Sequence, residues 1–369
     1  MSDLQEAEMK TGILTFVHTI NYGALLQAYA MQALLEKNGI DSEFIDYICP
    51  SVRRQHDPKM LWSKLKLKNK ILFPFLYCIY SKTQKKFAEF EKEYLRFSDV
   101  QYNRENISLT IDNYDSFLVG SDQVWNTDIT GGDMTYFLDF IPDKNKKLTY
   151  AASMGTADFP EQYRGKCYEL VRDFAFVNVR EKAGRQALIS NGISAECVLD
   201  PTLMLDKEQW LQFVGERPHK NKYIFMYMPP SDAEVIRKIR AYARKNGYEV
   251  FQAKRGIKPI RGFKTITALS PTEFLTWLYH AELVISGSFH GVCFSVLFEK
   301  PFWAVSFNNN NKLMGRIDNI LCELGLTERK YRNDIDFTDK KIDFAAANKK
   351  LNELKNASME ILKRTMQVR

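Results

Sequence analysis

Residues 11–48 indicate the fold class, and they read TGILTFVHTINYGALLQAYAMQALLEKNGIDSEFIDYI. The run Thr11–Val17 is short and largely apolar, which predicts a buried strand. Apolar side chains then recur at helical spacing up to Asn38-Gly39, a pair that commonly ends a helix. The run Glu43–Ile48 predicts a second strand. A strand, a helix and a strand in this order predict a βαβ unit, whose two strands lie parallel.

The rest of the chain repeats this alternation in two series. The first series continues with short apolar runs at 116–120, 148–152 and 176–179. The sequence VLDPT at 198–202 breaks the pattern, and a second series follows. Its expected elements are the strands 223–227, 248–252, 283–286 and 301–305 and the helices 233–245, 272–280, 289–298 and 313–324. We therefore predict an α/β protein of two Rossmann-like, doubly wound domains, 1–203 and 204–369, with a C-terminal helix that could pack back on the first domain.

Composition narrows the class of protein. The chain has 369 residues, 45% hydrophobic and 26% charged, which is typical of a globular protein with two cores. The longest apolar run, Ile71–Tyr80, is too short to cross a bilayer, and the polar first ten residues are unlike a secretory signal. Six scattered cysteines without a CxxC pair predict reduced thiols in a cytoplasmic protein, with neither a disulfide framework nor a zinc site.

The net charge of +7 is concentrated in one segment. Residues 52–97 contain twelve Lys or Arg against four Asp or Glu, so the remainder is close to neutral. A nucleic-acid groove would draw basic residues from several elements, and we expect no nucleic acid as partner. The block also contains many aromatic and aliphatic residues. It is either a helical insertion packed on its own domain or an amphipathic segment that lies on an anionic membrane surface.

Ligands of doubly wound sheets bind beyond the carboxyl ends of the strands, and three loops there contain unusual residues. The first loop includes Asn21, Tyr22 and Gly23 ahead of a helix, where a glycine lets backbone N–H groups approach an anion. A tight turn would need the same glycine.

The second loop, GSDQVWN at 120–126, presents Ser121, Asp122, Gln123 and Trp125 directly after a hydrophobic strand. An aromatic ring beside hydroxyl, carboxylate and amide groups suits a sugar, whose ring face stacks while its hydroxyls form hydrogen bonds. Alternatively, Asp122 caps a helix and Trp125 fills the core.

The third loop, SGSFHG at 286–291, places His290 in the first turn of an apolar helix, two residues after Ser288. The partial positive charge of the helix start favours a bound phosphate there. An anionic substrate also needs fixed cations, and the candidates near strand ends or a helix start are Arg180, Arg316, Lys254 and Arg255. The chain has no HxH, DxD or clustered Cys/His pattern, so we expect no metal.

Together these segments resemble the polysaccharide pyruvyl transferase family. The similar stretches are NYGALLQAYA at 21–30, GSDQVWN at 120–126, REK at 180–182, DPT at 200–202, and SFHG at 288–291 ahead of KPF at 300–302. The resemblance implies two GT-B-like domains that face each other across a cleft. It also implies transfer of the pyruvyl group of phosphoenolpyruvate to a sugar, which forms a cyclic ketal and releases phosphate.

The resemblance places the family's catalytic histidine at His290 and its phosphoenolpyruvate-binding arginine at Arg180. Members often have an arginine where this chain has Ser288, and Arg316, or Lys254 and Arg255, could supply the missing charge. Protonation of C3 of phosphoenolpyruvate by His290 would make C2 electrophilic, and Asp122 would act as base or as sugar ligand. We expect no cofactor beyond the donor substrate. The acceptor sugar could be lipid-linked, with the protein cytoplasmic or peripheral at the inner face of a membrane.

Two other functions remain compatible with the sequence. A GT-B glycosyltransferase that uses a nucleotide sugar would need an acidic ribose ligand in the second half, for which Glu273 and Glu282 are available. A non-catalytic, membrane-associated assembly protein of a polysaccharide pathway would explain the basic block at 52–97 and the serine at 288.

Overall fold

A computed structural model describes residues 9–55, 57, 59–64, 67–253, 260–307, 311–332, 336–338 and 341–367. The predicted alternation of strands and helices is confirmed over most of this range. The strands form two five-stranded sheets, one in each half of the chain, and all their pairings are parallel.

The first sheet has the order β3-β2-β1-β4-β5. Its strands are β1 (Lys10–Leu14), β2 (Asp41–Tyr47), β3 (Phe97–Tyr102), β4 (Ser116–Val119) and β5 (Lys147–Thr149). A parallel pair, β6 (Asn178–Val179) and β7 (Glu196–Cys197), lies next to β5 through isolated bridges from residues 148 and 152. The strand order reverses between β1 and β4, and this switch point is where doubly wound sheets bind ligands.

The second sheet repeats the same order as β10-β9-β8-β11-β12. Its strands are β8 (Tyr223–Tyr227), β9 (Glu249–Ala253), β10 (Lys264–Ile266), β11 (Leu283–Ser286) and β12 (Phe302–Ala304). Its switch point lies between β8 and β11. The strands at the centre of both sheets are almost fully buried, which explains their continuous apolar sequences.

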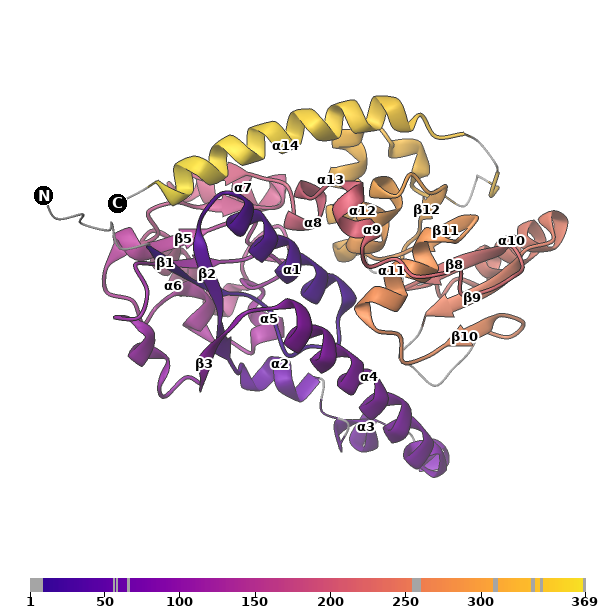
Figure 1. The fold of residues 1–369 in the computed structure, drawn as a ribbon, viewed down its shortest axis with the longest axis horizontal. Helices are drawn as coiled ribbons and strands as arrows, with labels where there is room; N and C mark the ends of the chain where they lie inside the picture. The colour runs from indigo at the N-terminus through magenta and orange to yellow at the C-terminus, as the bar shows by residue number, and fades with distance from the viewer. Residues whose placement is uncertain are drawn as a thin grey trace, which may run out of the picture.

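Helices cover both sheets (Figure 1). In the first half they are α1 (Tyr22–Lys37), α2 (Pro50–Gln55), α3 (Lys59–Lys64), α4 (Phe73–Tyr94), α5 (Thr127–Thr130), α6 (Glu161–Val171), α7 (Lys182–Ser190) and α8 (Pro201–Met204). In the second half they are α9 (Lys207–Leu211), α10 (Ala233–Asn246), α11 (Pro271–Tyr279), α12 (Phe289–Leu297), α13 (Asn311–Leu324) and α14 (Phe344–Met366). Short 3₁₀ helices cover 67–72, 107–110, 134–137, 144–146 and 327–329. None of the described helices combines the length and apolar character that crossing a bilayer requires.

Helix α14 runs along one side of the molecule from the second half to the first (Figure 1). Its Thr365 Oγ1 accepts a hydrogen bond from Asn178 Nδ2 at 2.6 Å, and its Ser358 Oγ accepts one from the backbone N–H of Leu199 at 3.0 Å. Near its start, Asn348 Nδ2 donates to Glu299 Oε1 of the second half at 2.8 Å. The last helix therefore contacts both halves through specific hydrogen bonds.

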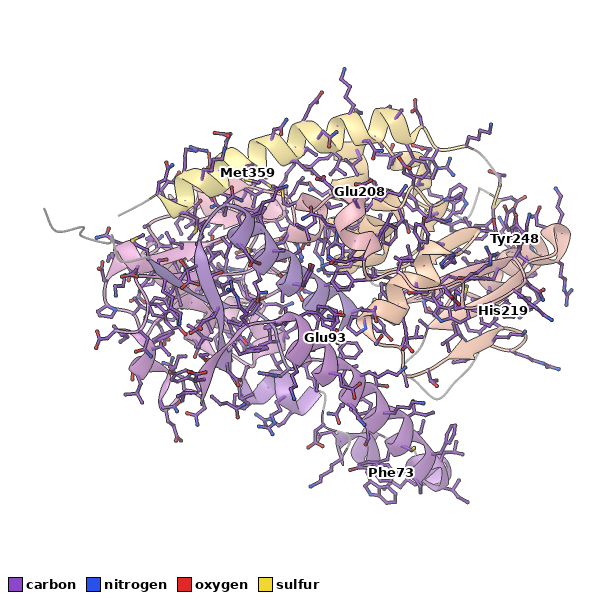
Figure 2. All side chains as sticks on the ribbon, in the orientation of Figure 1. Phe73, Glu93, Glu208, His219, Tyr248 and Met359 are labelled. Atoms are coloured by element: carbon purple, nitrogen blue, oxygen red, sulfur yellow. The ribbon has the colours of Figure 1, made fainter. Side chains whose placement is uncertain are left out.

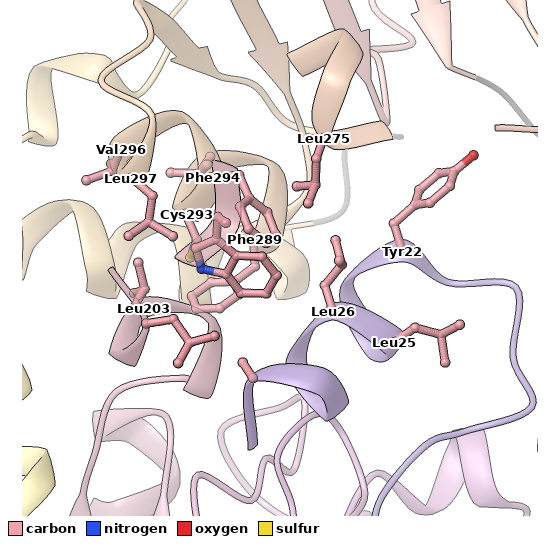
Figure 3. Packing of buried hydrophobic residues seen from close by; sticks show 14 of the residues in the cluster. Tyr22, Leu25, Leu26, Leu203, Leu275, Phe289, Cys293, Phe294, Val296 and Leu297 are labelled. Atoms are coloured by element: carbon pink, nitrogen blue, oxygen red, sulfur yellow. The ribbon is translucent and has the colours of Figure 1, made fainter. Parts of the chain in front are cut away.

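One buried hydrophobic cluster continues from the first half into the second. Figure 3 shows part of it, where Leu25 and Leu26 of α1 and Leu203 of α8 lie near Leu275 of α11 and Phe294 of α12. Two further clusters fill the remaining sides of the sheets, one in each half. The halves are thus joined by a shared apolar core.

The basic segment forms the connection from β2 to β3, which includes the long helix α4. The C-terminal part of α4 buries Phe87, Phe90 and Glu91 against the body of the molecule. The N-terminal part projects outward together with α3, with Phe73 at the far end and Glu93 at the body (Figure 2). We call the segment 59–86 the arm, of which the structure describes residues 59–64 and 67–86. The segment is thus partly a packed helix and partly a projection.

Candidate active site

The two switch points meet where α12 of the second half approaches the start of α1. His290 is the second residue of α12, and only 7% of its side chain is exposed. A Cβ added at Gly23 would overlap Nδ1 of the His290 ring and lie 2.7 Å from Cε1. Glycine at position 23 therefore makes room for a histidine that comes from the other half. We predicted that a backbone N–H here approaches an anion. In the structure the Gly23 N–H donates to Asn21 Oδ1 at 3.1 Å.

The carboxylate of Asp200 is the centre of the polar network at this junction. Its Oδ1 accepts hydrogen bonds from the backbone N–H and the hydroxyl of Thr202, at 3.0 and 2.7 Å. Its Oδ2 accepts from Ser121 Oγ at 3.1 Å and from Arg180 Nη1 at 2.6 Å. The Nε2 atom of His290 lies 3.6 Å from the same Oδ2. Asp200 thus connects three of the predicted site residues.

Electrostatics keep Asp200 ionised. Burial by itself would raise the pKa of this carboxyl, but the charges of His290 and Arg180 and the hydrogen bonds it accepts outweigh burial and hold the pKa well below its usual range. The local sequence explains the position: Asp200 caps α8, and Pro201 occupies the first helical position, where its missing N–H costs nothing.

Arg180 directly follows β6 and is buried among carboxylates. It forms ion pairs with Asp200, with Glu181 at 3.2 Å and with Asp122 at 3.8 Å, and its guanidinium lies 4.8 Å from the centre of the Phe289 ring. Burial opposes its charge, but Glu181, Asp200 and Asp122 raise its pKa above the usual value for arginine. A buried, charged group held in this way has a fixed orientation.

Asp122 and Ser121 lie next to Arg180 but differ in their surroundings. Asp122 is 3% exposed and has a φ of +70°, a left-handed conformation that aspartate adopts more readily than most residues. Ser121 is fully buried, and its hydroxyl bonds Asp200 and the carbonyl of Ala151. We predicted Asp122 as a catalytic base or sugar ligand and Ser121 as a substrate ligand. The hydroxyl of Ser121 contacts Asp200 and the backbone instead, so it orients Asp200.

Arg316 lies on α13, close enough to this cluster for its charge to interact with those of Arg180 and three carboxylates. Burial, and then the positive charge of Arg180, lowers its pKa, while Glu181, Asp122 and Asp200 act in the opposite direction. Within the part of the chain that the structure describes, three buried nitrogen atoms here lack a hydrogen-bond partner: Arg316 Nε, Arg180 Nη2 and His290 Nε2. Such nitrogens are suited to bind an anion.

Trp125 does not serve the predicted stacking role. Its side chain is fully buried, its Nε1 donates to the carbonyl of Tyr136 at 3.0 Å, and its ring stacks on Phe137. Trp125 therefore belongs to the core of the first half, which was the alternative interpretation. Gln123 is half-buried, and its Oε1 accepts a hydrogen bond from Asn126 at 3.0 Å.

Asn21 and Tyr22 also have structural partners. The Asn21 side chain accepts a hydrogen bond from Gly23 N at 3.1 Å and caps α1. The Tyr22 ring is 6% exposed and stacks on Phe274 of α11 at 4.6 Å, next to Tyr227. These contacts place Tyr22 in the apolar interface between the halves, rather than at a surface that is open to substrate.

The remaining predicted residues have mixed outcomes. Ser288 immediately precedes α12 and is 9% exposed, and its side chain forms no capping hydrogen bond. Lys254 and Arg255 lie outside the described residues.

The two acidic residues that a nucleotide-sugar enzyme could use to bind ribose form ion pairs with other side chains. Glu273 pairs with Lys86, and Glu282 pairs with Arg217. Among the described residues, no group of three His, Cys, Asp or Glu side chains could hold a metal ion.

Our sequence-based predictions missed two residues at this edge of the sheets. The sequence indicated Asp200 only as part of the DPT motif, a pattern that is typical of a helix N-cap. His18 was visible only as the start of the first loop; it pairs with Asp46 of β2 at 2.8 Å and with Glu91 of α4 at 3.1 Å. Burial would lower the pKa of His18, but the two carboxylates raise it to about 9.

Comparisons with known proteins agree with this architecture. The family model described as polysaccharide pyruvyl transferase matches residues 21–309. Among solved structures, a putative UDP-N-acetylglucosamine 2-epimerase from Listeria monocytogenes is 14% identical with a TM-score of 0.51, over 96% of this chain and 97% of that chain. The rhamnosyltransferase SpnG is 11% identical with a TM-score of 0.44, over 97% and 99%. No curated protein gives a significant sequence match.

Two parallel sheets of the same strand order, joined by a shared core, define a protein of the GT-B fold, which confirms the predicted fold class. The chain belongs to the polysaccharide pyruvyl transferase family. Family membership supports a transferase that acts on a sugar in polysaccharide biosynthesis.

Proposed function

We propose that the protein transfers the pyruvyl group of phosphoenolpyruvate to two hydroxyls of one sugar, forming a cyclic ketal and releasing phosphate. The observation that carries this proposal is the set of buried nitrogen atoms without hydrogen-bond partners on Arg180, Arg316 and His290. A small donor with both a carboxylate and a phosphate needs more than one fixed cation, and Arg180 and Arg316 would each hold one of these groups. In this role Arg316 replaces the charge that Ser288 lacks.

The proposed roles follow from the geometry. Nδ1 of His290 is packed against Gly23, so Nε2 is the nitrogen that can reach a ligand. His290 would donate a proton to C3 of phosphoenolpyruvate, which turns C2 into an electrophile. A sugar hydroxyl would then attack C2 and lose its proton to Asp122. The bond from C2 to the phosphate oxygen then breaks and phosphate leaves. The second hydroxyl attacks C2, gives its proton to the His290 imidazole, which was deprotonated in the first step, and completes the ketal.

Asp200 would act through its neighbours as a positioning residue. It holds Arg180 by a hydrogen-bonded ion pair and lies 3.6 Å from the reacting nitrogen of His290. The acceptor that we propose is a sugar of a polysaccharide precursor carried on a lipid, with the protein cytoplasmic and peripheral at the inner face of a membrane. The basic, partly apolar segment at 52–97 supports this location.

The test is a phosphate-release assay with phosphoenolpyruvate and a panel of galactosides and N-acetylhexosamine glycosides. We expect His290→Ala to lower the rate by at least about 10²-fold, with the melting temperature within a few degrees of the unchanged protein. His280→Ala, which alters a partly exposed histidine at the end of α11, is the control and should leave the rate unchanged.

Thermal melting with ligands separates this proposal from a nucleotide-sugar enzyme. Phosphoenolpyruvate should raise the melting temperature by mass action, whereas UDP-N-acetylglucosamine should not. Stabilisation by the nucleotide sugar alone, or full phosphate release by His290→Ala, would contradict the proposal.

A further inference from the structure

The arm exposes apolar side chains far from the proposed active site. The described chain exposes ten large hydrophobic side chains, and six of them lie on the arm, with Ile71 at 85% and Phe75 at 67%. The other four are Met60, Trp62, Leu72 and Tyr77. Trp62 and Phe73 meet edge to face at 5.1 Å, so the tip is a small aromatic cluster. A cluster of this kind on a projection contributes nothing to the core of the body.

The charge of the arm is of one sign. Residues 59–86 contain eight lysines and no Asp or Glu. Lys59, Lys82 and Lys85 are exposed, and Lys70 Nζ lies 4.6 Å from the centre of the Trp62 ring. Tryptophan and tyrosine rings edged by lysine are suited to the boundary between lipid headgroups and acyl chains.

We infer that the arm is a docking element for an anionic lipid bilayer. Its apolar tip would enter the interface while its lysines contact acidic headgroups. A second copy of the chain fits less well, because two arms would bring sixteen lysines together without an acidic partner from either arm. The inference extends the proposed lipid-linked acceptor, but binding to the bilayer does not depend on the transfer reaction.

The base of the arm is fixed to both halves at the edge of the candidate site. Lys86 Nζ pairs with Glu273 of α11 at 2.6 Å, and the Phe87 ring packs on Tyr22, next to Gly23, at 5.2 Å. The fourteen residue-to-residue steps from Phe73 to Phe87 rise by about 1.5 Å each, so the tip extends roughly 20 Å along α4 from this contact. A docked arm would therefore hold the candidate site at a set height above the lipid surface.

The test is co-sedimentation of the full chain with vesicles. Vesicles of phosphatidylglycerol and phosphatidylcholine should bind the protein at low salt, and binding should weaken at high salt, whereas phosphatidylcholine alone should bind little. Each lysine near an anionic surface contributes about fivefold to binding. Lys59→Glu with Lys70→Glu, both close in sequence to the exposed Trp62 and Ile71, should therefore weaken it at least tenfold. Lys349→Glu, at an exposed lysine of α14, is the matched control.

The contribution of the exposed apolar side chains to vesicle binding is tested separately. Trp62→Ser, Ile71→Ser and Phe75→Ser combined should abolish binding, while Leu109→Ser, at a side chain that is 69% exposed on the body, should not. Brominated lipids should quench tryptophan fluorescence in the unchanged protein. Trp62→Phe should remove the quenching but keep the binding. Trp125, Trp210 and Trp303 are buried, and the partly buried Trp277 lies on α11 of the body, away from the tip of the arm.

Three results would overturn the inference: negligible binding to anionic vesicles at low salt, equal binding to both kinds of vesicle, or quenching that persists in Trp62→Phe. Sedimentation of the protein as a dimer that the triple serine variant dissociates, without vesicle binding, would assign the arm to self-association instead. The vesicle assay uses no substrate, so its failure and a failure of the phosphate-release assay are distinguishable.

Discussion

The contact of Gly23 with His290 joins the two halves of the chain at the atoms for which we propose chemistry. One half supplies the carboxylates and Arg180, and the other supplies the imidazole and Arg316. The position of the His290 ring depends on the absence of a side chain at residue 23, because the space that a Cβ would occupy is filled by the ring. A side chain at this position would therefore displace the ring that carries the reacting nitrogen, Nε2.

Gly23→Ala should displace His290 and lower phosphate release by at least tenfold. Overpacking at a buried site should also lower the free energy of unfolding by about 1–3 kcal/mol. The measurements are the rate of phosphate release and the melting temperature. Gly165→Ala, in an exposed part of α6 with no atom near the added Cβ, is the control and should stabilise the protein by about 0.5–1 kcal/mol. Unchanged activity in Gly23→Ala would show that the ring can move without loss of function.

The two arginines should respond differently to replacement. Arg180→Ala leaves the buried carboxylate of Asp200 without its cation, so the free energy of unfolding should fall by about 3–5 kcal/mol. Arg316 forms no ion pair among the described residues, and burial opposes its charge. Arg316→Ala should therefore raise the KM for phosphoenolpyruvate at least tenfold while the melting temperature stays the same or rises. An unchanged KM for phosphoenolpyruvate would remove Arg316 from the donor site.

The candidate site was only partly predictable at this scale. His290, Arg180 and Asp122 were predicted because polar residues that directly follow buried strands are unusual. The prediction that Trp125 stacks on a sugar was wrong, because an indole in a strand-end loop gives the same sequence pattern whether it faces solvent or the core. Asp200 was missed because its network comes from residues far apart in sequence, such as Ser121 and His290.

Among the elements, α4 has the widest range of roles, because it crosses from β2 to β3 and carries the arm. Its Glu91 and the Asp46 carboxylate of β2 hold His18, whose own conformation is left-handed with a φ of 55°. The loop after β1 is thereby tied to α4 by a charged histidine. This tie depends on pH, since it is strongest while the imidazole is protonated.

The stability of the protein should fall as pH rises because of His18. The pKa is raised in the folded protein from 6.5 to about 9, so the stabilisation is complete below about pH 6.5 and is lost as pH approaches 9. The loss should be on the order of 2–3 kcal/mol. His18→Asn introduces a residue that tolerates the left-handed conformation but does not titrate in this range. The free energy of unfolding of this variant should therefore decrease less as pH rises. The measurement is urea unfolding at pH values from 6 to 9.5, and parallel curves for both proteins would contradict the prediction.

Element prediction succeeded for buried strands, including the edge strand β12, and failed for the two exposed edge strands. The bounds predicted for β8 and β11 are those observed, because both strands lie at the centre of a sheet and are uniformly apolar. The edge strands β3 and β10 were missed, since their side chains are mostly exposed and their sequences show no apolar run. The arm was open to two interpretations because amphipathic spacing does not show which part of a helix has a partner.

For the whole molecule, the shared core and α14 predict one cooperative unit in place of two independent domains. Apolar side chains from both halves form a single cluster, and α14 bonds the first half through Ser358 and Thr365. Separating the halves would expose this cluster to water, which costs free energy in proportion to the apolar area. Unfolding of either half should therefore remove the support of the other.

Calorimetry should show a single transition, with equal calorimetric and van't Hoff enthalpies. Ser358→Ala removes the acceptor of the buried Leu199 N–H, which costs about 1–3 kcal/mol and should lower the temperature of that single transition by a few degrees. Asn356→Ala, at an exposed position two residues earlier on the same helix, should not lower it. Because phosphoenolpyruvate is proposed to bind groups from both halves, it should raise the temperature of the whole unfolding transition, which should stay a single transition. Two resolved transitions, or a shift confined to part of the heat absorption, would mean that the halves unfold independently and that α14 does not couple them.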